Sequence, residues 1–191
     1  MPAPSPGFFS AERRVIRTWT PEELAHHFTL SAGERVFLGH KGAAATLHLA
    51  ALLKTFQVGG EFLDRPQAVP AAVIDVLSQQ LGLSPALWAE VDWSTRTARR
   101  YRDEVAHFCG FRAFRAPDGA ALIAHLTPLV ADLNPDSESL RQRGRDFLRG
   151  QRLVPPTAQR FSRCLRAAVG AQEEHWMQSI QRRLSPQPVR P

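Results

Sequence analysis

The sequence predicts an all-α protein in which successive three-helix, helix-turn-helix-like units are followed by a further helical block. Helix-capping residues recur along the chain, apolar residues return with a period near 3.6, and no segment alternates apolar and polar residues long enough to indicate a strand. We expect a flexible tail over 1–18, helical units over 19–60 and 61–115, a third helical block over 116–184, and a second tail over 185–191.

Two capped helices open the first unit, after a short helical turn expected over 11–17. In the stretch TPEEL, Thr20 is the N-cap, a proline takes the first helical position and two glutamates face the positive helix end, which predicts a helix to about Phe28. Ser31 and Glu34 have the spacing of a capping box and predict the start of the next helix.

Apolar patterning and glycine mark the helices that follow. The stretch AAATLHLAALLKTF is apolar on all sides of a helix, which predicts a central, buried helix. Pro70 and Gly82 bound the next helix, with Gly82 as its C′ residue. After a further start at Ser84, a helix is expected from about Thr95 to Cys109.

Three helical segments are expected in the third block, over 118–133, 137–151 and 157–184. Gly170 interrupts the last of them at a cost of about 1 kcal/mol relative to alanine, and the far end of this helix is interpreted as structural. Its expected packing stripe consists of Phe161, Leu165, Ala168, Gln172 and Trp176.

The basic residues are concentrated in the second half of the chain. Residues 1–92 carry 7 basic and 9 acidic residues, a net charge of −2, whereas residues 93–191 carry 17 and 9, a net charge of +8. All 17 of the later basic residues are arginines, whose planar guanidinium suits phosphate oxygens and guanine edges. The exclusive use of arginine in this half favours a nucleic-acid partner. The alternative explanation for the abundance of arginine is a codon bias towards arginine and alanine.

The helix expected from about Thr95 to Cys109 places arginines opposite an apolar stripe. That stripe consists of Ala98, Tyr101, Val105 and Phe108. Arg96 and Arg100 lie nearly opposite it, and Arg99 lies on its flank. Arg102 sits near the apolar edge and has to snorkel. Arginines in the first turn and a half are typical of a recognition helix that enters the major groove of DNA.

Further arginines extend this predicted DNA-binding set. Arg112 and Arg115 follow the helix and are expected to reach flanking phosphates. A second stripe, with only Asp146 nearby to offset its charge, consists of Arg141, Arg145, Arg149 and Arg152. The alternative is a solvated surface, because Asp103 and Glu104 each lie four residues after an arginine and form ordinary helix pairs. Two acids cannot neutralise the six arginines from Arg96 to Arg115, so DNA binding is favoured.

Other classes of protein find no support in the sequence. No apolar run approaches a membrane span, and the opening MPAPSPGFFS lacks the pattern of a signal peptide. The isolated Cys109 and Cys164 indicate reduced thiols in the cytoplasm. The histidines lack metal-ligand spacing, and no nucleophile, phosphate-loop or dinucleotide motif is present. We therefore expect no catalytic residue, no metal site and no cofactor.

Four stretches, taken in order, resemble the N-terminal region of Tn-three family (class II, replicative) transposases, a region that carries a domain of unknown function. They are WTPEELAHHFTLSAGERVFL, ALLKTFQVGGEFLDRPQAVPAAVIDVLSQQLGL, DWSTRTARRYRDEVAHFCGFRAF and LVPPTAQRFSRCLRAAV, and the resemblance covers about 19–184. It implies a helical region that recognises the terminal inverted repeats of the transposon. The family's magnesium-binding acidic triad, in a downstream RNase H-like domain, has no counterpart in this sequence.

The resemblance also implies which residues bind DNA. RTARRYR resembles the family's RTAERHR, which supports the arginines at 96, 99, 100 and 102. Where the family typically shows NRLGFALLLKFF, this chain has ATLHLAALLKTF: Ala45 and Thr46 replace the Asn-Arg pair, His48 replaces a glycine, and Lys54 is retained as a DNA contact. The first unit is therefore expected to have lost DNA contacts.

The expected function is non-catalytic binding of double-stranded DNA, the terminal inverted repeats of a transposon, in a cytoplasmic, nucleoid-associated protein. Further expected partners are a full-length transposase or a separately encoded catalytic part, with no membrane partner. The alternatives are a helical adaptor or inhibitor that binds an intact transposase, and a truncated relic without function.

Overall fold

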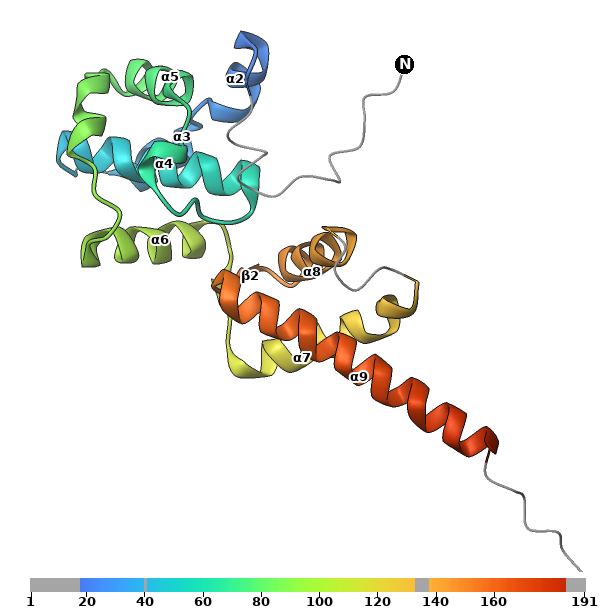
Figure 1. Cartoon of the computed structure of the whole chain (residues 1–191). Helices are drawn as coiled ribbons and strands as arrows, with labels where there is room; N and C mark the ends of the chain where they lie inside the picture. The colour runs from blue at the N-terminus through green and yellow to red at the C-terminus, as the bar shows by residue number, and fades with distance from the viewer. Residues whose placement is uncertain (1–17, 40, 133–137, 185–191) are drawn as a thin grey trace, which may run out of the picture. The chain divides into compact units, whose positions relative to one another are not determined.

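The chain folds into two compact helical units, 1–113 and 114–191 (Figure 1). This is a computed structural model, and it describes residues 18–39, 41–132 and 138–184. The expected turn over 11–17 and most of both expected tails lie outside those ranges. The all-α class is confirmed, because β1 (Arg112–Ala113) and β2 (Leu153–Val154) are the only strands within the described ranges. The segments expected as a first and a second helical unit belong to one compact unit.

The first unit is built around one buried helix. Helix α4 (Ala43–Gly59) contacts α2 (Pro21–Phe28), α3 (Ala32–Leu38), α5 (Ala71–Leu81) and α6 (Arg96–Phe108). The 3₁₀ segments η1 (Pro66–Ala68) and η2 (Pro85–Glu90) connect the later helices. Every residue of α4 from Leu47 to Phe56 is buried, so the prediction of a central helix covered on all sides is confirmed.

Local capping fixes where the first helices begin and where α5 ends. The hydroxyl of Thr20 accepts a hydrogen bond from the Glu23 amide, and the Glu23 carboxylate accepts one from the Thr20 amide in return. Ser31 and Glu34 form the same reciprocal pair at α3. Gly82 follows α5 in the left-handed conformation, with φ of 66°. The predicted caps at these three positions are confirmed.

The second unit consists of α7 (Ala116–Leu126), η3 (Thr127–Ala131), α8 (Glu138–Gly150), β2 and α9 (Ala158–Leu184). Its core contains Leu122, Leu126, Leu140, Leu148 and Leu165 together with Phe161 and Ala168. Helices α8 and α9 approach closely at Gly144, where an added Cβ would lie 2.8 Å from Cζ of Phe161. The segment expected as one helix over 118–133 is instead α-helical to Leu126 and 3₁₀-helical beyond it.

Two aromatic residues expected in the core are exposed. Phe108, at the end of α6, is 41% exposed and stacks on Phe37 rather than entering the core. Trp176 is 64% exposed, because the described helices that cover the first part of α9 do not extend alongside its second part (Figure 1). The predicted packing stripe of α9 therefore ends at Ala168, its last buried residue.

Candidate nucleic-acid interface

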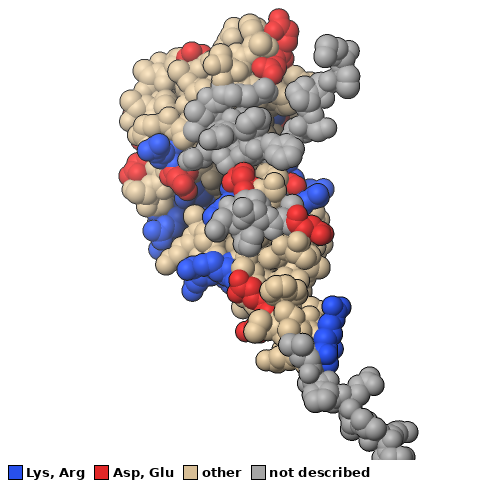
Figure 2. Space-filling model, turned by 45° about the vertical axis from the view of Figure 1, so that its right-hand side comes forward, with Lys and Arg blue, Asp and Glu red and all other residues tan. Residues whose placement is uncertain are grey.

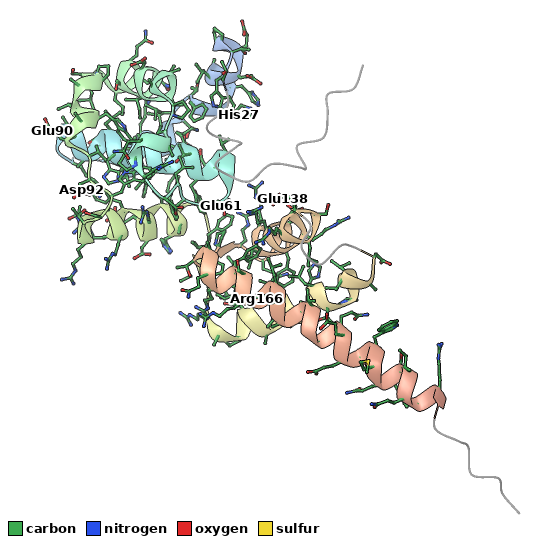
Figure 3. The ribbon with its side chains drawn as sticks, viewed as in Figure 1. His27, Glu61, Glu90, Asp92, Glu138 and Arg166 are labelled. Carbon is green, nitrogen blue, oxygen red and sulfur yellow. The ribbon has the colours of Figure 1, made fainter. Side chains whose placement is uncertain are left out.

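Hydrogen bonds of Thr95 and Asp92 define the start of helix α6. The hydroxyl of Thr95 accepts a hydrogen bond from the Ala98 amide at 3.1 Å, so Thr95 is the N-cap of α6. Just before it, Asp92 (Figure 3) accepts hydrogen bonds from the amide and the hydroxyl of Ser94 at 2.8 and 2.9 Å. These two bonds hold the pKa of Asp92 below its usual value. The start of α6 is thus fixed in place by its own sequence.

Three arginines project from this first part of α6. Arg96, Arg99 and Arg100 are exposed, and Arg100 lies 3.4 Å from Glu104, a carboxylate that Lys41 also holds at 2.7 Å. Within the described part of the chain, neither Arg96 nor Arg99 forms an ion pair. We call these three arginines the α6 arginine row.

Arg96, the first residue of α6, stands where helix electrostatics disfavours a cation. The first turn of a helix carries partial positive charge, which favours acidic side chains there. Helices α2 and α3 follow that rule, with acidic residues in their first turns, whereas α6 has none and has Arg96 as its first residue. The helix dipole therefore does not favour Arg96, whereas Arg100 is stabilised by its pair with Glu104.

Arg102 turns away from the row. It is half-buried, and its guanidinium lies 5.6 Å from the ring centre of Trp93, which itself stacks on the buried His48. Burial lowers the pKa of Arg102, the charge of Asp64 opposes that change, and Arg99 adds to it. Arg102 thus packs under α6, as its predicted snorkelling suggests, and does not share the exposed position of the row.

His48 belongs to this cluster, although its sequence position marked it only as a departure from the family pattern. It is 6% exposed and stacks between Trp93 and the edge of Tyr101. Burial lowers its pKa to about 4, and the charge of Arg102 contributes to the shift. His48 is therefore neutral near pH 7 and joins α4 to the inner face of α6.

The structure corrects the prediction for Lys54. This residue is 6% exposed, and its ammonium lies 3.2 Å from the carboxylate of Glu34, which also accepts a hydrogen bond from Gln57 at 2.7 Å. Burial alone would raise the pKa of Glu34, but the hydrogen bonds from Ser31 and Gln57 and the charge of Lys54 outweigh it and lower the pKa. Lys54 is an internal counter-ion and is not available to a phosphate group.

The predicted stripe on α8 is only partly a surface feature. Arg141 is half-buried, and Arg145 is paired with Glu138 (Figure 3) at 2.8 Å. Arg149 and Arg152 are exposed, but neither is without an interaction partner. The expectation that Asp146 alone offsets the stripe is wrong: Glu138 provides a charge partner, and Asp146 accepts a hydrogen bond from Gln142.

The two arginines that follow α6 are exposed. Arg112 lies in β1, and its guanidinium is 3.5 Å from the carbonyl oxygen of Ala113. The Arg115 amide donates to the Asp118 carboxylate at 2.7 Å, at the start of α7. On the face shown in Figure 2, Lys and Arg side chains form separate clusters with Asp and Glu between them.

No group of three His, Cys, Asp or Glu side chains among the described residues is arranged to hold a metal ion. None of the described helices combines the length and hydrophobicity of a transmembrane segment.

The chain is an all-α protein of a recognised family. Residues 11–168 match the family described as Domain of unknown function (DUF4158). The match covers most of the 191 residues, and the chain belongs to this family. No curated protein matches it.

Proposed function

We propose that this chain is a non-catalytic DNA-binding protein related to the N-terminal region of Tn-three family transposases, and that it recognises transposon terminal inverted repeats. The α6 arginine row is the observation that carries the proposal. It combines the exposure of all three side chains with a capped start of the helix and the absence of a first-turn acid. Such a helix start is what a protein presents to the major groove.

The family relationship supports the proposal from a second direction. The matched region includes all of α6 and most of the second unit, and the ordered motifs resemble the transposase N-terminal region. In this proposal Arg96, Arg99 and Arg100 contact DNA, while Arg112 and Arg115 reach flanking phosphates. Arg149 and Arg152 remain secondary candidates for backbone contacts, and the proposed location is the nucleoid.

Selection from a random-sequence duplex pool tests this proposal, because it requires no assumption about the target sequence. The wild-type chain is expected to enrich a defined sequence. The variant Arg96→Lys/Arg99→Lys keeps both charges but loses the planar fork that reads guanine. We expect this variant to retain binding to the unselected pool and to lose about 1–3 kcal/mol of preference for the enriched site for each base contact removed.

Two results would contradict the proposal. Recovery of no enriched sequence by the wild-type chain would reject sequence-specific recognition. Equal enrichment by the lysine variant would reject base readout by these two arginines. Arg163→Lys/Arg166→Lys provides the matched control, because it makes the same two exchanges at exposed arginines outside the row.

A further inference from the structure

The second half of α9 carries an apolar surface that no described part of the chain covers. From Glu173 to Gln178 every side chain is exposed, with Trp176 at 64% and Met177 at 54%. Exposed large apolar residues are ordinary when isolated, but neighbouring ones mark an interaction surface. Figure 1 shows this part of α9 extending past the other helices of its unit.

Four side chains of this segment share one helix face in a defined order. Trp176 and Ile180 are four residues apart, which places them one above the other. Glu173 lies seven residues before Ile180, and Arg183 lies seven residues after Trp176, so both fall on the same side. Along the helix, this face therefore presents an acidic residue, two apolar residues and a basic residue, in that order.

We propose that this face (Glu173, Trp176, Ile180 and Arg183) binds the same face of a second copy of the chain in an antiparallel helix pair. In that pair, Trp176 packs on Ile180 of the second copy, and Glu173 faces Arg183 of the second copy. The contact is isologous, so each interaction occurs twice about a twofold axis.

The charges at the two ends of this face indicate both that its partner is a second copy of the chain and that the two helices run antiparallel. A parallel pair would place Glu173 against Glu173 and Arg183 against Arg183, and like charges facing each other across an interface are costly. The antiparallel pair instead places opposite charges at both ends of the apolar centre. The face is therefore complementary to itself in one orientation.

The expected association is weak and depends on concentration. A few turns of one helix pair bury less than the ~1,200 Å² of total surface at the low end of stable interfaces. We expect dissociation constants in the range of about 10–500 µM, and DNA plays no part in the contact. The proposal consequently stands or falls independently of DNA binding.

Sedimentation equilibrium of the full chain over this concentration range tests the proposal. The wild-type chain is expected to pass from monomer to dimer. Trp176→Ala is expected to raise the dissociation constant at least ~10-fold without lowering the melting temperature, because Trp176 is 64% exposed. A wild-type chain that stays monomeric, or that forms only larger aggregates, overturns the proposal.

Charge reversal tests the register. Glu173→Arg and Arg183→Glu are each expected to weaken the dimer ~10-fold or more, and the double variant Glu173→Arg/Arg183→Glu to restore it to within ~3-fold of the wild type. Glu174→Arg makes the same charge change off this face and is expected to leave the dimer unchanged. A dimer insensitive to the single reversals, or one weakened equally by Glu174→Arg, overturns the antiparallel arrangement.

Discussion

Helices α6 and α8 have the same length and the same number of arginines, yet their arginines have different environments. Each helix has 13 residues, and each carries four arginines. In α6, three of them are exposed at the start of the helix. In α8, only Arg143 and Arg149 are exposed, while Arg141 is half-buried and Arg145 is paired with Glu138. Composition alone therefore does not show which arginines are exposed and which are held inside the protein.

The arginines of the two helices differ in environment because the acidic residues lie at different positions in α6 and α8. Helix α8 has Glu138 in its first turn, which suits the helix dipole and pairs with Arg145 seven residues on. Helix α6 has no acid before Asp103, and Glu104 is shared between Lys41 and Arg100. We therefore predict that variants of Arg96 and Arg99, which form no ion pair with another described residue, change DNA binding. Variants of Lys54 and Arg145, which carboxylates hold, are expected to change stability or nothing.

Lys54→Met is expected to have the largest effect on stability. It leaves the buried carboxylate of Glu34 without its counter-ion, and breaking a buried pair in this way costs about 3–5 kcal/mol. Urea unfolding followed by tryptophan fluorescence measures the loss. Affinity for DNA, measured where the variant is still folded, is expected to stay the same.

The double variant Glu34→Gln/Lys54→Met sharpens this prediction, since it leaves no unpaired charge and keeps an acceptor for the Ser31 amide. It is expected to recover part of the lost stability. A Lys54→Met chain of normal stability but weakened DNA binding would show that Lys54 reaches the surface, against the structure.

Acidification is expected to destabilise the first unit through His48. Its folded-state pKa of about 4 lies below the ordinary value of 6.5, so the folded state favours the neutral ring. The stability from this residue is complete above pH 6.5 and is lost as the pH falls from 6.5 to 4, by about 2 kcal/mol at pH 5. His48→Leu should reduce the difference in unfolding free energy between pH 7.5 and pH 5 by that amount; an unchanged difference would refute the assignment.

Two glycines within helices of the second unit should respond to alanine with opposite signs. In α8, Gly144→Ala brings a Cβ to 2.8 Å from the Phe161 ring, and overpacking of about 1–3 kcal/mol outweighs the gain in helix propensity. In α9, Gly170 has no atom within 4 Å of an added Cβ, so Gly170→Ala should stabilise by about 0.5–1 kcal/mol. Thermal unfolding distinguishes the two, and a shared sign would contradict the close approach at Gly144.

Arg145→Ala is expected to have the smallest effect. Its pair with Glu138 is half exposed on the glutamate side, and such pairs contribute about 0.2–1 kcal/mol. DNA affinity is expected to change less than in any single variant of the α6 arginine row. A larger loss of affinity for Arg145→Ala than for Arg96→Ala would reverse the comparison between α6 and α8.

The sequence predicted best what depends on neighbouring residues. The caps at Thr20 and Ser31 are hydrogen bonds within three residues, so their positions could be found from spacing alone. Lys54 was misassigned because its partner Glu34 lies 20 residues away, on another helix. Trp176 was misassigned because apolar periodicity continues along α9 beyond the point where other described helices cover it. Apolar periodicity identifies which side of a helix is apolar, but it does not show which other part of the protein, if any, covers that side.

The salt dependence of binding to a labelled random-sequence duplex tests the central claim most directly, with Arg96→Ala/Arg99→Ala compared against Arg163→Ala/Arg166→Ala. Both variants remove two exposed arginines, so the net charge is matched. Each phosphate contact contributes about −0.9 to the slope of log affinity against log salt. We predict a slope shallower by about 1.8 for the α6 variant and an unchanged slope for the α9 variant. Equal slopes for the two variants would contradict the assignment of DNA contacts to the α6 arginine row.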